Sequence, residues 1–187
     1  MRVTIAVRPS GIAMDASAAT KPNDEARFTE EEHAFLLSRV QPALIGLIDG
    51  SLSTLAPIFA VALSTEDPHI AFFAGLATAV GAAVSMAFSE ALSDTGEYTG
   101  RGSPLQRGAI TGGGTFFGGV FHTLPFLINH YNVAILVGII TVAIELVLLA
   151  VIRAKFFRTG FLRSFATVTL GGVIIVAVSA ALGSAAA

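Results

Sequence analysis

Long apolar stretches separated by short polar links dominate the chain from residue 40 onward. Five stretches are each long enough, at roughly 20 residues or more, to cross about 30 Å of hydrocarbon as an α-helix. They run approximately over 40–64, 69–93, 107–129, 132–156 and 161–184. Because the links between the third, fourth and fifth stretches are only a few residues long, these helices should form tight hairpins. The pattern predicts an all-α membrane protein with five transmembrane helices.

The N-terminal region has a different composition, rich in Ala, Ser, Thr and charged residues. Such a segment buries too little apolar surface to fold, so we predict a disordered cytoplasmic tail over residues 1–27. Residues 28–187 then form the five-helix transmembrane domain, with an interfacial helix at its start. Thr29 and Glu32 have the spacing of a capping box at a helix N-terminus. A solvated, capped helix start is the simpler interpretation of this turn, and metal collection by Glu32 and His33 is the alternative.

Composition narrows the class of protein. Only 13% of the 187 residues are charged, against about 25% in an ordinary soluble domain. The chain has no cysteine, which excludes disulfides and thiolate metal ligands. No nucleophile–base pair and no cofactor-binding loop is recognisable. We therefore expect a protein that is not an enzyme, whose partner is the lipid bilayer rather than nucleic acid.

Charge distribution predicts the orientation. The five-span arrangement places every Lys and Arg on one side of the membrane, and positive residues favour the cytoplasm. The N-terminus is then cytoplasmic and the C-terminus outside. An added or missing span would scatter these residues, which are Arg2, Arg8, Lys21, Arg27, Arg39, Arg101, Arg107, Arg153, Lys155, Arg158 and Arg163.

Acidic residues inside the spans are the strongest sign of function, since each costs about 2.5–3.5 kcal/mol at the membrane centre on insertion scales. Asp49 lies roughly 14 Å deep in the first span, and Met86 lies at a similar depth one turn before Glu90. We interpret Asp49, Met86 and Glu90 as metal ligands, with Glu90 at the cytoplasmic mouth. A thioether beside carboxylates favours a transition metal over Mg²⁺ or Ca²⁺. The alternatives are a polar clamp between helices for Asp49 and gap filling for Met86.

Two further polar residues fall within spans and leave several roles open. Glu145 is either a carboxylate for proton coupling or the partner of a polar group on another helix. His122, toward the outer face, could relay protons, bind an exiting metal or hydrogen-bond a neighbour. Together with Glu32 and His33, these residues are candidates for proton coupling or a secondary metal site.

Two segments of the chain resemble the vacuolar iron transporter family. The first is Asp49-Gly50 with the Ser and Thr residues that follow, and the second runs from Val84 to Glu90 with the sequence VSMAFSE. The five spans and the sequence pattern from Arg163-Ser164 to Gly171-Gly172 are also similar to that family. The resemblance therefore covers about residues 34–185. The segment His122-Thr123-Leu124-Pro125 is more similar to the bacterial branch of membrane-bound ferritins (erythrin–vacuolar iron transport), in which a ferritin-like domain precedes the membrane domain. The residues before the first span are too few for that domain.

The resemblance implies a homodimer that exports Fe²⁺, and often Mn²⁺, from the cytoplasm in exchange for protons. It implies that Asp49 and Met86 line the ion path at the dimer interface, and Glu90 matches the family's Glu. The metal is then a transported substrate, and no cofactor is bound permanently. The bacterial likeness favours an inner (plasma) membrane.

One feature of the family is missing here. Vacuolar members carry a long Glu-rich extension between the second and third spans that gathers metal, and residues 94–106 are too short for it. Metal capture would then fall to the turn at residues 30–33 or to a partner, for which a ferritin-like protein is a candidate. Two alternatives to a proton-coupled exporter stay open: a passive metal channel, and a non-transporting membrane scaffold for a ferritin-like partner.

Overall fold

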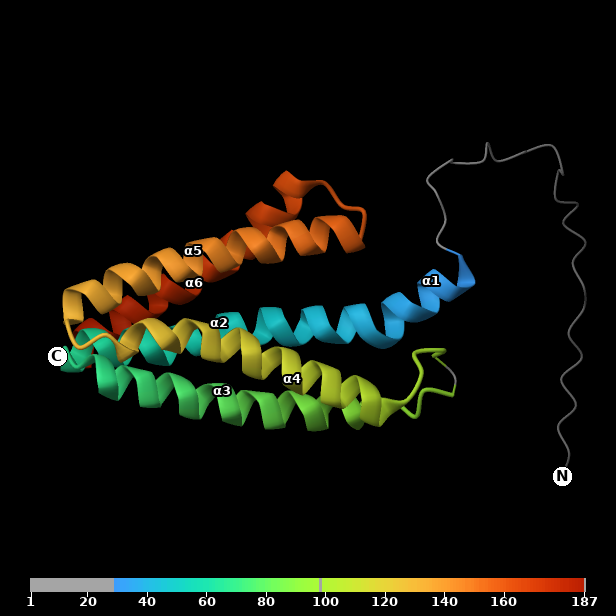
Figure 1. Ribbon diagram of the computed structural model, residues 1–187, viewed down its shortest axis with the longest axis horizontal. Coiled ribbons are helices and arrows are strands. Elements are labelled where there is room, and N and C mark those ends of the chain that lie inside the picture. The colour runs from blue at the N-terminus through green and yellow to red at the C-terminus, as the bar shows by residue number, and fades with distance from the viewer. Residues whose placement is uncertain (1–28, 98, 187) are drawn as a thin grey trace, which may run out of the picture.

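Five long helices lie side by side in the computed structural model, which describes residues 29–97 and 99–186 (Figure 1). The predicted tail, residues 1–27, lies outside the described residues. The elements in chain order are α1 (Glu30–Phe35), a π-helical turn η1 (Leu36–Val40), α2 (Gln41–Thr65), α3 (Pro68–Ala91), α4 (Pro104–Thr123), a 3-10 turn η2 (Leu124–Leu127), α5 (Tyr131–Phe156) and α6 (Phe161–Ala186). The all-α prediction is therefore confirmed for the described part of the chain.

The predicted capping box is present at the start of α1. The amide of Glu32 donates to Thr29 Oγ1 at 3.2 Å, and the amide of Thr29 donates to Glu32 Oε2 at 2.9 Å. α1 has no buried residue, and it continues through η1 into α2. Glu32 and His33 thus lie on a short exposed helix at one end of the bundle, where Glu32 is occupied by the cap.

α2, α3 and α4 pack by close approach of their backbones. A Cβ atom added to Gly46 would lie 2.1 Å from the carbonyl oxygen of Thr111 on α4, and one at Gly50 would lie 2.0 Å from that of Thr115. The other flank of α4 approaches α3 as closely, because a Cβ atom added to Gly112 would lie 2.7 Å from the Cβ atom of Ala87. Small residues let helices approach closely where lipid supplies no hydrophobic drive for helices to associate. α4 is therefore fixed between α2 and α3 by glycine and alanine contacts.

The opposite side of α2 packs against α5 and α6 through larger apolar side chains. Phe59 of α2 meets Phe126 of η2 edge to face, with ring centroids 6.1 Å apart. The buried cluster around this pair comprises Leu55, Ile58, Ala62, Ala71, Ala134, Val142, Leu146, Leu149 and Val168. α2 consequently runs through the middle of the bundle, with α3 and α4 on one side and α5 and α6 on the other.

Four helical stretches in the described residues are long and apolar enough to cross a membrane: Glu30–Thr65, Pro68–Ala91, Tyr131–Phe156 and Phe161–Gly183. α4 is not among them, although it has 20 residues and lies alongside the others. Its inward faces consist of Gly, Thr, Arg and His, whereas Phe117 remains 70% exposed on the outer side. Four of the predicted spans are thus supported, and the crossing by α4 stays a prediction.

The predicted bounds of the third span need a correction. The sequence pattern predicted 107–129, but the helix is Pro104–Thr123 and is followed by the 3-10 turn. Pro104 suits the first turn of a helix, where no amide donor is needed, and Pro125 has no amide to continue the helix. Proline positions therefore set both ends, whereas hydropathy alone extended the segment too far.

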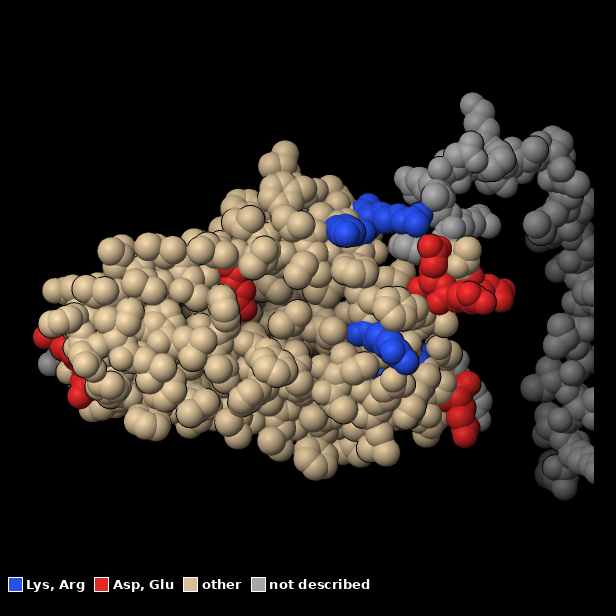
Figure 2. Space-filling view, viewed as in Figure 1, with Lys and Arg blue, Asp and Glu red and all other residues tan. Residues whose placement is uncertain are grey.

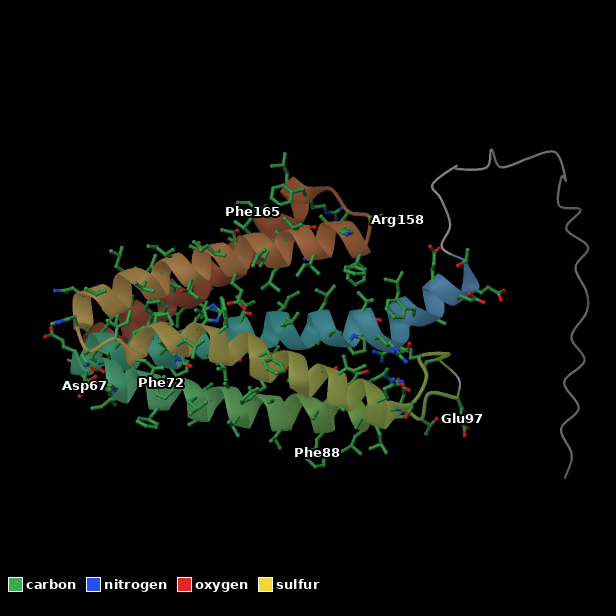
Figure 3. All side chains as sticks on the ribbon, in the orientation of Figure 1. Asp67, Phe72, Phe88, Glu97, Arg158 and Phe165 are labelled. Carbon is green, nitrogen blue, oxygen red and sulfur yellow. The ribbon has the colours of Figure 1, made fainter. Side chains whose placement is uncertain are left out.

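Basic residues gather at one end of the bundle. In the described residues they lie in η1, in the α3–α4 link and α4's first turn, and around the α5–α6 link (Figure 2). Asp67 lies at the opposite end, where its carboxylate caps α3 by accepting from the amides of His69 and Ile70 (Figure 3). This asymmetry agrees with the charge pattern predicted from the sequence.

Candidate functional site

Asp49 lies on a flank of α2 between two packing surfaces. Gly46 and Gly50 face α4, and Leu52 approaches Gly171 of α6. The Asp49 side chain is half-buried and has no hydrogen bond or ion pair within the described part of the chain. Ser53, one helical turn further on, has a buried hydroxyl oxygen that also lacks a partner among the described residues. The flank therefore offers unpaired oxygen atoms that can accept a cation.

Met86 lies at nearly the same depth as Asp49 but on another helix. Gly50 is opposite Thr115 of α4, and Gly112, one turn earlier on α4, is opposite Ala87 of α3. Asp49 and Met86 consequently differ in depth by about one helical turn, roughly 5 Å. Met86 is half-buried, beside the face of α3 that packs against α4. The helices α2 and α3, which carry these two side chains, pack against different flanks of α4, and the pairing of Asp49 with Met86 stays a prediction.

Glu90 belongs to a cluster of ion pairs at the basic end of the bundle. Its Oε1 accepts from Arg101 Nη2 and from Arg107 Nε, each at 2.8 Å. Asp94 completes the cluster, 3.3 Å from Arg101 and 3.0 Å from Arg107. The Arg107 side chain is fully buried and also donates to the carbonyl of Gly102 at 3.0 Å. A metal ion that bound Oε1 of Glu90 would compete with two guanidinium groups.

The charge of Asp94 is set by the same cluster. Partial burial raises the pKa of the Asp94 carboxyl, but hydrogen bonds from Arg107 and from the amide of Gly96, together with the nearby positive charges, outweigh it. The net result is a pKa below the ordinary value of 3.8. Asp94 is thus ionised at neutral pH, and the α3–α4 link is held by charged hydrogen bonds.

A second polar site is buried among α2, α4 and α5. The carboxylate of Glu145, 8% exposed, is hydrogen-bonded through Oε1 to the hydroxyl of Ser51. Its Oε2 lies 2.9 Å from Nε2 of His122, which is 2% exposed and whose Nδ1 is 3.0 Å from the carbonyl oxygen of Gly118. The Nε2–Oε2 contact is short but lies off the axis of a hydrogen bond, so neither atom has an aligned partner among the described residues.

The two sites occupy opposite faces of α2. Asp49 and Ser51 are two residues apart, which places them about 160° apart around an α-helix. Sequence reasoning named Glu145 and His122 separately, and the structure brings them together. It did not find Ser51, although a serine in register with Leu55 on the apolar face of α2 is a detectable signal. It also did not pair Glu90 with Arg101 and Arg107.

Within the described ranges, no three His, Asp or Glu side chains are grouped so that they could hold a metal ion. The predicted ligands Asp49 and Met86 supply one carboxylate and one thioether from each chain, and their role as metal ligands stays a prediction. Any site built on Asp49 and Met86 needs ligands from elsewhere, because transition metals in proteins usually take four or more.

The fold and these sites define a multi-pass helical membrane protein with unpaired and paired polar groups buried at membrane depth. A model of the VIT family matches residues 40–99, which include α2, α3 and the residues Asp49, Met86 and Glu90. Comparison with curated proteins and with solved structures gave no match. The resemblance to the vacuolar iron transporter family is thereby confirmed over that stretch. The match implies iron or manganese transport in general and agrees with the prediction of a protein that is not an enzyme.

Proposed function

We propose that this protein exports Fe²⁺, and Mn²⁺ as a second substrate, from the cytoplasm in exchange for protons. The observation that supports this most directly is Asp49, an acid without a partner in the described chain, set half-buried in a helix that matches the VIT family. An acid at this depth is costly and is retained where it binds or moves ions.

The charge asymmetry supports a direction for the path. By the positive-inside rule, the basic end of the bundle faces the cytoplasm. The C-terminus then lies outside, and the proposed location is the bacterial inner membrane. Glu90 then lies at the cytoplasmic mouth, where Arg101 and Arg107 restrain it. Metal passes from this mouth to Met86 and Asp49.

A homodimer would complete the metal site. The flank of α2 that carries Asp49 is not fully covered by α4 or α6, since Asp49 and Ser53 both remain partly accessible. A symmetric pair of chains facing each other there contributes two copies of Asp49 and of Met86. Carboxylate ligands suit Mn²⁺ and other hard divalent ions, and the thioether ligands favour a softer transition metal such as Fe²⁺.

The test is Fe²⁺ flux into proteoliposomes with and without a pH gradient, under conditions that keep iron reduced. We compare the wild type with Asp49→Asn, which removes the charge at constant size, and with Glu97→Gln, an exposed acid in the α3–α4 link (Figure 3). We expect gradient-driven flux in the wild type and in Glu97→Gln, and none in Asp49→Asn.

Other results identify the alternatives. Flux that requires Asp49 but ignores the pH gradient indicates a passive metal channel. Absence of Fe²⁺ and Mn²⁺ flux in the folded wild type contradicts transport and leaves the membrane scaffold, whose candidate partner is a ferritin-like protein.

A further inference from the structure

The buried contact between Glu145 and His122 requires at least one proton. Nδ1 of His122 faces the carbonyl of Gly118, so in the neutral ring the hydrogen is on Nδ1 and Nε2 is a bare acceptor. A bare Nε2 lone pair 2.9 Å from an ionised Glu145 oxygen would be repulsive. A proton held on Nε2 turns this contact into an ion pair, so the one-proton state has His122 protonated and Glu145 ionised. With one proton its net charge is zero, which is the least costly state at membrane depth.

The Ser51 hydroxyl provides evidence for a second proton position. Its Oγ lies within hydrogen-bond distance of both Glu145 Oε1 and the carbonyl oxygen of Leu47, the latter at 2.7 Å. A hydroxyl has one hydrogen and cannot donate to both. If Glu145 carries a hydrogen on Oε1, it donates to Ser51, and Ser51 donates to Leu47. If Oε1 carries no hydrogen, the Ser51 hydroxyl donates its hydrogen bond to Glu145 instead.

We propose that Glu145 and His122 are the proton-carrying pair of the transporter, which alternates between one and two bound protons, and that Ser51 transmits the change to α2. The proposal rests on the proposed function, because it assigns the protons of that exchange to a site separate from Asp49. In the uptake step, which starts with His122 protonated and Glu145 ionised, a proton from the outer solution binds Oε1 of Glu145. The Ser51 hydroxyl keeps its hydrogen and rotates, so that its hydrogen bond changes from Oε1 to the Leu47 carbonyl. Release reverses both movements, and only O–H bonds form or break.

No other titratable side chain in the described residues faces this pair. α3 carries His69 and Glu90 at its two ends, and α6 carries Arg163 in its first turn. The remaining titratable residues of α4 and α5 also lie near their ends, at Arg107, Tyr131, Arg153 and Lys155. Asp49 lies on the far side of α2. The charge of the pair is thus set by Glu145 and His122 themselves.

The packing explains how proton binding reaches the metal side of α2. A Cβ atom at Gly118 would lie 2.6 Å from the Leu47 carbonyl oxygen and 3.1 Å from Ser51 Oγ. The backbone of α4 at Gly118 therefore touches both acceptor and hydroxyl, and its carbonyl faces His122. Leu47 and Ser51 flank Asp49 in the same turn of α2. A change in the Leu47 and Ser51 hydrogen bonds acts directly on the turn that carries Asp49.

The experiment separates metal movement from its coupling to protons. Proteoliposomes with the membrane potential clamped at zero are assayed for Fe²⁺ flux down its own gradient, for accumulation driven by a pH gradient, and for proton counterflux with an internal pH dye. The variants are Glu145→Gln, His122→Gln and Ser51→Ala. The matched control is Ser179→Ala, a fully buried serine of α6 that also donates to the carbonyl four residues earlier but has no titratable partner among the described residues.

We expect Glu145→Gln and His122→Gln to keep downhill Fe²⁺ flux and to lose proton counterflux and accumulation. In the wild type, accumulation can reach about tenfold per pH unit for each proton exchanged. Ser51→Ala should lower the ratio of protons to metal, and Ser179→Ala should match the wild type. Wild-type accumulation in Glu145→Gln, or loss of downhill flux in folded Glu145→Gln and His122→Gln together, would overturn the proposal.

A second measurement does not depend on transport. In pH-difference infrared spectra of the purified protein, a carboxylic-acid band should vanish in Glu145→Gln and persist in Asp49→Asn. A spectrum in which no titrating band depends on Glu145 also overturns the proposal. If the wild type carries no metal at all, the proposed function fails, while the infrared result still decides whether this pair takes up protons. If Glu145→Gln does not fold, the comparison of Ser51→Ala with Ser179→Ala decides.

Discussion

Replacing Gly50 by alanine should disrupt the contact on which the α2–α4 packing depends. The added Cβ atom would lie 2.0 Å from the carbonyl oxygen of Thr115, 2.7 Å from its carbonyl carbon and 2.8 Å from its Cα. All three are backbone atoms, so no side-chain rotation can make room. Ordinary contact begins near 3.4 Å. The two helices would have to separate locally by 3.4 − 2.0, or about 1.4 Å.

Forcing extra volume into a well-packed contact typically costs about 1–3 kcal/mol, occasionally more. At about 2–4 °C per kcal/mol for a chain of this size, the melting temperature should fall by roughly 2–12 °C. Asp49 and Ser51 flank this glycine, so the same displacement moves both polar sites and should also reduce transport. The matched control is Gly113→Ala on α4, where an added Cβ atom meets nothing within 4 Å.

The assay is thermal unfolding of the purified protein in one detergent, followed by the fraction that remains monodisperse in size-exclusion chromatography. We expect Gly113→Ala to melt at or slightly above the wild-type temperature, because alanine favours a helix over glycine. Equal melting temperatures for Gly50→Ala and Gly113→Ala would refute the close approach of α2 and α4.

Three further predictions concern the basic end of the bundle. Arg107→Ala leaves Glu90 and Asp94 without their fully buried partner and should lower the free energy of unfolding by about 3–5 kcal/mol. Arg101→Ala removes a side chain that is 20% exposed and should lower it by about 1 kcal/mol or less. Equal melting temperatures for the two variants would contradict this. Thr29→Ala removes the capping box and should lower the local stability of α1 by about 0.5–2 kcal/mol, which would appear as faster amide exchange at Glu32. The global melting temperature should not change, because α1 has no buried residue. The lowered pKa of Asp94 means that its contribution is complete above about pH 3.8 and is lost as the pH falls through the lowered value. The Gly96 amide, 2.6 Å from Asp94, should stay protected from exchange down to about pH 4 and lose protection only in stronger acid.

Much of the fold could be predicted because hydropathy sets where membrane helices form. The predicted spans 69–93, 132–156 and 161–184 match Pro68–Ala91, Tyr131–Phe156 and Phe161–Ala186 within three residues. The capping box at Thr29 was also readable, because both of its residues are local in sequence. α4 was the least accurate segment, since its polar residues face neighbouring helices and its ends are set by prolines.

The candidate sites were only partly readable for a different reason. The sequence by itself determined that Asp49, Glu90, Glu145 and His122 are polar residues in or near apolar helices, because each has a cost that local sequence makes visible. Helical periodicity places a side chain on a face of its own helix, but it does not state which faces meet. Tertiary structure alone decided that Glu145 pairs with His122 and with Ser51, 94 residues away in the chain. It also decided that two arginines hold Glu90, and that α2 separates Asp49 from the Glu145 site, because helix order and packing angles fix those contacts.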